Sequence, residues 1–437
     1  MDLKTQLAQK KMNAYQWFIV GLCILLNIVD GYDVMVMAFT AAAVSADWQL
    51  SGSILGLLLS IGFIGMALGS FLIAPKADKI GRRNLILICL AICSMGMLLS
   101  ALTQNPYQLA ACRLLTGLGI GGILTNASVV ANEFSSQRWK SLSVSLLSMG
   151  YALGAVLGGI VAYHLTASHG WRSVFLFGGL LTTSVLVICL FVLPESLEYL
   201  VVKQPKKALE KINQLSKKIG LPALTQLPVI STTQQKTSFK KLFSPELASQ
   251  TICIWVAFFT VMAGFYFILS WTPKILAMAG MSVEQGVNLG TFLNIGGILG
   301  AILMGTISSK FQIHKILAIF LSATAVSILI FISFAHVYSY ALWIGVLIGM
   351  MANGCIAGLY ALSTVTYSTE IRATGVGLAI SMGRIGAIMA PLLAGYFLDL
   401  GISPLNLYLV AAMLFGTGFI MLLISYRQYK RARLVTA

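Results

Sequence analysis

The sequence predicts an all-α membrane protein with twelve transmembrane helices in two six-helix bundles, and three observations support this. First, 58% of the residues are hydrophobic and only 10% are charged, with a mean hydropathy of +0.89. A soluble domain would carry roughly a quarter charged residues. Second, apolar runs of about twenty residues recur along the chain, each long enough to span a bilayer core. Third, one long polar segment divides these runs into two equal sets.

The apolar runs are predicted to be helices because lipid offers the backbone no outside hydrogen-bond partner. The predicted spans are 17–43, 52–74, 84–102, 107–131, 141–165, 171–193, then 249–271, 285–307, 315–334, 339–366, 373–396 and 404–426. We therefore expect an N-terminal six-helix bundle at 1–193, a cytoplasmic basic linker loop at 194–248, and a C-terminal six-helix bundle with a basic tail at 249–437. The linker should include a surface helix that carries Lys206 to Lys218.

Lysine and arginine residues gather in alternate loops of this arrangement. The formal net charge is +16, and the intervening loops hold little positive charge beyond Arg172 and Lys274. By the positive-inside rule, both termini and the linker are expected in the cytoplasm of a bacterial cell, with the chain in the inner membrane. The charge therefore suits a bilayer, and we expect no nucleic-acid partner.

The residue types argue against several other classes of protein. All seven cysteines fall in apolar segments, with no CxxC pair and no cluster with histidine at ligand spacing. No nucleophile and base occur at a common depth. We expect no enzymatic activity, no metal and no cofactor, and the chain is expected to be a monomer.

Two acids lie in the middle of the first predicted helix. Asp30 and Asp33 are three residues apart and so share one face of that helix. A charged side chain at this depth costs about 2.5–3.5 kcal/mol on insertion scales, so such acids face a wet cavity, pair with a cation or hold a proton. This pattern is typical of a proton-coupling site.

Arg113 lies inside the fourth predicted helix, about 10 Å from its non-cytoplasmic end. Its depth is compatible with an ion pair to Asp33 or to Asp30. Such a pair could open when a substrate carboxylate competes for Arg113, or it could be a permanent structural ion pair. Arg113 is our first choice for binding a carboxylate.

In the second half, Arg384 also lies near mid-membrane, with no acid in its own helix. It needs an anion or a backbone carbonyl, which could be a substrate carboxylate, a helix 1 acid or a helix end. Tyr266 and Tyr360 are candidates to contact a substrate ring, because a phenol both stacks and donates a hydrogen bond. Most aromatic residues in membrane helices face lipid or pack, which is the alternative for both.

Charged residues also cluster at the predicted cytoplasmic helix ends. Glu133 lies about 30 Å from Arg113 along the same helix, so it cannot contact the same substrate. It is expected to be a gate partner for Arg82 or Arg83, with a proton relay as the alternative. Asp78, beside the two arginines, is expected to help pin helix ends through charge-assisted bonds. Simple positive-inside anchoring is the alternative reading of this loop.

The end of helix 10 repeats part of this pattern. Glu370 is followed by Arg372, as Glu133 is followed by Arg138 in the first half. We therefore add Glu370 and Arg372 to the gating candidates.

The loop from Ala74 to Arg83 resembles the signature of the major facilitator superfamily, with Asp78, Gly81 and both arginines in register. Its first glycine is Ala74 here, and its leucine is Lys76. Across nearly the whole chain the sequence also resembles the aromatic acid:proton symporter family. The matching segments are Asp30 to Asp33, Arg113 to Gly119, Gly170 to Arg172, Pro194 to Ser196, Glu370 to Gly377 and Gly383 to Gly386.

This resemblance implies the major facilitator fold and proton-coupled import of benzoate, hydroxybenzoates or related carboxylates by alternating access. It also implies that Asp30, Asp33 and Arg113 belong to the transport site. Two alternatives remain: a proton-driven exporter of amphipathic compounds on the same fold, and a non-transporting membrane receptor for such acids. The buried arginines favour an anionic substrate over the cations that many exporters carry.

Overall fold

The structure is a computed structural model that describes residues 11–227, 242–244, 247–308, 310–368 and 371–436. Within these ranges, twelve helices are long and apolar enough to cross a membrane, as predicted. The first six spans are α2 (Ala14–Trp48), α3 and its continuation (Gly52–Ile80), α5 (Arg82–Ser100), α6 (Pro106–Phe134), α7 (Lys140–His169) and α8 (Trp171–Val192). The last six are α11 (Ala248–Met278), α12 (Val283–Ser308), α13 (Ile313–Phe334), α14 (Tyr338–Thr366), α15 (Arg372–Asp399) and α16 (Leu407–Thr436).

Three helices extend clearly beyond their predicted ends. Helix α16, predicted to end at residue 426, continues to Thr436. Helix α2 continues past residue 43 to Trp48 and ends where Gln49 takes a left-handed backbone with φ of 50°. Helix α11 continues past Trp271 through Pro273. The sequence-based end at 271 was wrong because proline breaks soluble helices, whereas neighbouring helices allow it inside a membrane span.

The segment predicted as a loop at 74–83 is mostly helical, which corrects that prediction. After α3 proper (Gly52–Leu68) the chain makes a π-helical turn at Gly69–Ile73, a 3-10 turn at Ala74–Lys76 and the short helix α4 at Ala77–Ile80. The break is Gly81, whose φ of 94° favours glycine. Only a single residue therefore separates this continuation from α5.

Contacts divide the chain into two compact units, and we describe each by itself. Unit 1 comprises the described parts of Met1–Val36, Ile61–Gly158 and His169–Gln234. Unit 2 comprises those of Met37–Ser60, Gly159–Ser168 and Gln235–Ala437. Helices α2, α3 and α7 therefore contribute residues to both units. The domain boundaries proposed from the sequence at 193 and 249 stay a prediction.

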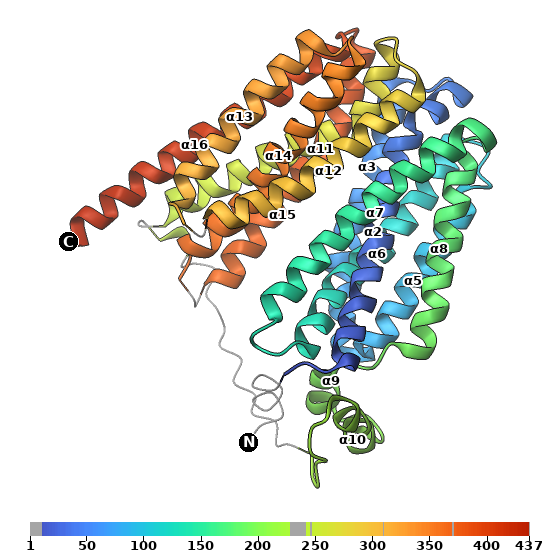
Figure 1. The fold of residues 1–437 in the computed structure, drawn as a ribbon, viewed down its shortest axis with the longest axis vertical. Coiled ribbons are helices and arrows are strands. Elements are labelled where there is room, and N and C mark those ends of the chain that lie inside the picture. Colours follow the sequence, from blue (N-terminus) through green and yellow to red (C-terminus); the bar gives the residue numbers. More distant parts are fainter. Residues whose placement is uncertain (1–10, 228–241, 245–246, 309, 369–370, 437) are drawn as a thin grey trace. The chain divides into compact units, whose positions relative to one another are not determined.

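In unit 1, apolar side chains of α2, α5, α6 and α8 form one core that continues into the linker helices α9 (Leu197–Lys203) and α10 (Ala208–Ile219). Figure 1 shows α9 and α10 at one end of this bundle. Ile212, Leu215 and Ile219 form the buried face of α10, at helical spacing. The expected surface helix is therefore present with Lys211, Lys217 and Lys218. It begins at Ala208, so Lys206 and Lys207, which were predicted to lie on it, precede it.

In unit 2, α11 is the central helix. It packs against α12, α15 and α16, while α13 packs against α14 and α16 (Figure 1). The ends of α2, α3 and α7 that belong to this unit lie against these second-half helices.

Candidate functional site

The two acids of α2 lie in the interior of unit 1. Asp30 is 3% exposed and Asp33 is 2% exposed. Gly31, between them, lets α7 approach, because a Cβ at Gly31 would overlap the backbone carbonyl of Tyr151. Gly154 of α7 allows the reciprocal approach to Ile28. Small residues on both helices thus bring α7 against α2 at the level of the acids.

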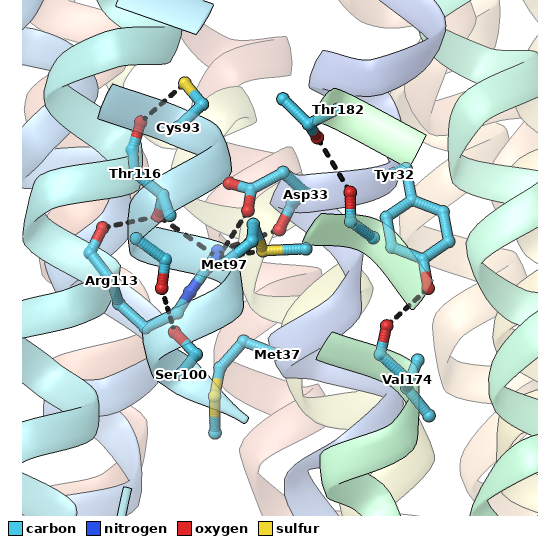
Figure 2. A network of polar contacts seen from close by, with 12 residues as sticks. Tyr32, Asp33, Met37, Cys93, Met97, Ser100, Arg113, Thr116, Val174 and Thr182 are labelled. Atoms are coloured by element: carbon cyan, nitrogen blue, oxygen red, sulfur yellow. Dashed lines mark hydrogen bonds and ion pairs between the residues drawn. The ribbon is translucent and has the colours of Figure 1, made fainter. Parts of the chain in front are cut away.

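Helix α6 supplies the cation that pairs with this region. The helix begins cleanly, because the side chain of Asn105 caps it by accepting from the Gln108 amide, and Pro106 occupies the first turn. Arg113 follows two turns later and is 3% exposed. Nη1 of Arg113 donates to Asp33 Oδ1 at 2.7 Å, and Nη2 donates to the Asp33 main-chain carbonyl at 2.8 Å (Figure 2).

The ion pair therefore forms with Asp33, which decides between the two partners that the sequence left open. Thr116 and Met97 complete the contacts of Nη1, at 3.2 Å to Oγ1 and 3.7 Å to Sδ. The ring of Phe175 lies 6.0 Å from the guanidinium carbon, within cation–π range. Arg113 is thus held by three helices of unit 1 besides its own.

Two atoms of this buried pair are not satisfied. Asp33 Oδ2 and Arg113 Nε make no hydrogen bond to any residue that the structure describes. Buried polar atoms are nearly always hydrogen-bonded, so an exception calls for an explanation. A pair with spare acceptor and donor capacity is better suited to exchange partners than a fully satisfied structural pair.

Tyr32 was not singled out from the sequence, although it stands between the two acids. It is 1% exposed, and its hydroxyl donates to the Val174 carbonyl on α8 at 2.7 Å (Figure 2). Its ring packs on Phe177, with centroids 5.9 Å apart. Tyr32 thereby fixes α2 against α8, and only its place in the matching segment Asp30 to Asp33 could have indicated it.

A second cluster of charges lies at the linker end of unit 1. Arg82 forms an ion pair with Glu133 of α6, one of the two partners proposed for that acid. Ser196 connects them: its hydroxyl donates to Glu133 Oε2 at 2.6 Å and accepts from Arg82 Nη1 at 3.2 Å. Glu198 lies 3.6 Å from the other guanidinium nitrogen of Arg82.

Glu195 caps the start of α5 from another part of the chain. Its Oε1 accepts from the backbone amides of Arg83, at 3.1 Å, and Ser196, at 2.9 Å. Arg83 in turn donates to the carbonyls of Leu190 and Leu193 at the end of α8. Pro194 to Ser196 stood out only through the family resemblance, so the roles of Glu195 and Ser196 were missed.

Two of the three remaining gating candidates lie in the part of the chain that the structure describes. Asp78 is exposed and makes no ion pair with any described residue, so its role stays a prediction. Arg372, at the start of α15, donates through Nε to the Tyr367 carbonyl at 3.3 Å. Glu370 lies outside the described residues.

In unit 2, Arg384 of α15 lies within electrostatic range of Tyr360 on α14. The Tyr360 ring stands edge-on to Phe258 of α11, with centroids 5.5 Å apart. Tyr266 is eight residues beyond Phe258 on α11, which is about 12 Å along the axis. Tyr360 thus lies between Arg384 and Phe258, while the ring of Tyr266 stands edge-on to Phe265, with centroids 5.4 Å apart.

Comparisons with known proteins agree with this architecture. Residues 23–391 match the Major Facilitator Superfamily. The chain is 33% identical to a gallate transporter of Pseudomonas putida, over 100% of this chain and 98% of the relative. It is also 33% identical to the 4-hydroxybenzoate transporter PcaK of Pseudomonas aeruginosa, over 92% and 90%. Among solved structures, the xylose transporter XylE from E. coli is similar, with a TM-score of 0.72, 15% identity and coverage of 95% and 99%.

Proposed function

We propose a function for this chain, which belongs to the Major Facilitator Superfamily. It is a multi-pass membrane protein and a secondary transporter of aromatic acids, and it is not an enzyme. Beyond this, we propose that it imports its substrate with protons through the bacterial inner membrane. The positive-inside pattern supports placing both termini in the cytoplasm, and we propose that the chain works as a monomer.

The observation that carries proton coupling is the buried ion pair of Asp33 and Arg113 beside a second buried acid, Asp30. A carboxylate substrate that binds Arg113 competes with Asp33 for it, because both terminal nitrogens of the guanidinium already donate to that residue. Competition leaves extra negative charge in an apolar interior, which is costly.

A proton removes this cost. Adding one carboxylate and one proton together leaves the total charge of the substrate and of Asp30, Asp33 and Arg113 the same as before binding, so the two are favoured together. We therefore propose that one proton accompanies each carboxylate and is held by the acids of α2. The unsatisfied atoms Asp33 Oδ2 and Arg113 Nε support a pair that exchanges partners over a permanent structural one.

The second unit contributes a separate candidate for substrate recognition. Arg384, Tyr360 and Phe258 combine a cation, a phenol and an apolar ring, which suits a hydroxylated aromatic carboxylate. We propose these side chains as substrate contacts. Tyr266, about two turns further along α11, is proposed as a further contact of the substrate ring. Arg82, Arg83, Glu133 and Arg372 are proposed as gating residues.

Uptake by proteoliposomes tests this function. Labelled benzoate, 4-hydroxybenzoate, gallate and nicotinate are offered with an inward proton gradient, an inward sodium gradient or no gradient. We expect accumulation of at least one acid that follows the proton gradient and collapses with a protonophore. Accumulation that follows sodium and ignores the protonophore would disprove the coupling, while failure of every acid to enter would disprove the substrate class.

A further inference from the structure

One carboxylate connects two helices that are far apart in the sequence. Asp399, the last residue of α15, accepts hydrogen bonds at the first turn of α3: Oδ1 from the Gly52 amide at 2.6 Å, and Oδ2 from the Ser53 amide at 2.8 Å. Oδ2 also accepts from the Ser53 hydroxyl at 2.5 Å. The first amides of a helix have no partner within it and attract negative charge. Asp399 thus supplies the cap of α3 from 346 residues away.

Next to this cap the two helices touch through their backbones. A Cβ at Gly56 would lie 2.6 Å from the Pro391 carbonyl oxygen, and side chains at Gly52 or Gly395 would overlap the opposite backbone. Trp271 of α11 donates to the same Pro391 carbonyl at 3.2 Å, which fixes that side of the contact. Small residues let the two helices approach closely without interlocking their side chains. The helices can therefore separate and come together again.

This contact joins a helix of the first half of the chain to a helix of the second half. Helix α3 belongs to the first six spans and α15 to the last six. Residues of α3 up to Ser60 nevertheless group with unit 2, while those from Ile61 group with unit 1. The end of α7 also groups with unit 2, and Gly159 there lies against Thr291 of α12. At this end, opposite the basic segment that follows α3, first-half helices are closed onto second-half helices.

We propose that Asp399 and the first turn of α3, Gly52 and Ser53, form a latch that holds this end of the transporter closed and releases when this end opens to admit substrate. The bonds of Asp399 are exposed to solvent, so water can replace each of them as the latch opens. A buried ion pair would resist opening far more strongly. The proposal rests on transport by alternating access, and it does not depend on proton coupling.

Two cysteines test whether the contact must open. In Ser53→Cys/Asp399→Cys, a short bis-methanethiosulfonate crosslinker, which forms a disulfide bond with each thiol, should join α3 to α15. We expect uptake to stop after crosslinking and to return when a reductant cleaves the link, while each single cysteine variant responds little to the reagent. Full uptake by the crosslinked protein would overturn the proposal, because the contact would then not have to part.

A labelling experiment tests what the charge of Asp399 does. Leu55, two residues after Ser53, is 2% exposed, so Leu55→Cys should react slowly with a membrane-impermeant maleimide while the latch is closed. We expect Asp399→Asn to raise this rate about fivefold, the factor that matches loss of a helix N-cap. Asp47→Asn, which neutralises another exposed acid near the same end, is the matched control for the loss of one negative charge and should raise the rate less than Asp399→Asn does.

The comparison of the two variants decides the outcome. No change in Asp399→Asn, or an equal rise in both variants, would overturn the latch. A protein that transports its substrate without a proton gradient would contradict only the proposed coupling, because both latch experiments measure opening and not its driving force.

Discussion

Arg113 on α6 bonds to Asp33 on α2 twice, once through the carboxylate at 2.7 Å and once through the main-chain carbonyl at 2.8 Å. The side chain of Asp33 therefore accounts for only one of the two bonds. When a substrate or a proton displaces the carboxylate, the carbonyl still holds Nη2 and keeps the guanidinium oriented. A planar fork with two separated donors is suited to this arrangement, and a single ammonium is not.

Arg113→Lys should therefore fail to restore the uptake that Arg113→Ala loses. Lysine keeps the charge but cannot donate to both oxygens of Asp33 from fixed positions. We expect uptake to fall about tenfold or more, since a hydrogen bond to a charged group contributes about 1.5–3 kcal/mol. Initial uptake rates, normalised to the amount of protein in the membrane, measure this. Wild-type uptake by Arg113→Lys would show that a positive charge is sufficient there.

Arg384→Lys tests the second arginine as a substrate contact. If Arg384 binds the carboxylate, the variant should raise KM for uptake about tenfold while leaving the dependence on the proton gradient intact. Tyr360→Phe is the companion variant, because it keeps the ring that packs on Phe258 and removes only the hydroxyl. A loss of coupling with unchanged KM in Arg384→Lys would instead place Arg384 in the proton pathway.

Ser196→Ala should destabilise the cluster at the linker end of unit 1. The hydroxyl accepts from the Tyr199 amide as the N-cap of α9 and also bridges Arg82 to Glu133. We expect a loss of about 1 kcal/mol from the cap alone and a lower unfolding temperature in detergent. Ser184→Ala, at an exposed serine that bonds only one turn back on α8, is the control. An equal effect of both variants would remove any special role for Ser196.

The sequence predicted the parts of this site that follow from depth and helical spacing. Asp30, Asp33 and Arg113 stand out because charges are rare in apolar helices, and their positions along α2 and α6 made a pair possible. Periodicity could not decide which acid pairs with Arg113, because the rotation of one helix about its axis depends on packing. Here Gly31 and Tyr32 set that rotation through contacts to α7 and α8.

Contacts that depend on the tertiary fold could not be predicted from the sequence. Glu195 caps α5 and Asp399 caps α3, and each acid is remote in sequence from the helix it caps. A local capping residue can be found within a few positions of a helix start. A carboxylate that arrives from another helix leaves no such local pattern. The end of α11 was missed for a related reason, since Pro273 breaks the helix pattern locally but not inside a bundle.

The last prediction concerns how Asp30 and Asp33 divide their roles. Asp33 holds Arg113, so Asp33→Asn should leave the buried arginine without a counter-charge, which costs about 3–5 kcal/mol for a broken buried pair. We expect this variant to lose both proton-driven accumulation and substrate exchange. Asp30 lies one turn away on the same face, and we propose that it carries the proton, so Asp30→Asn should lose accumulation but retain exchange.

Counterflow in proteoliposomes preloaded with unlabelled substrate separates these outcomes, because exchange needs no net proton movement. Asp33→Glu serves as a control that keeps the charge and shifts its position. Counterflow that is lost in Asp30→Asn but retained in Asp33→Asn would reverse the assignment, placing the proton on Asp33. Equal loss in both would mean that the two acids bind the proton as one unit, which their shared face of α2 would then explain.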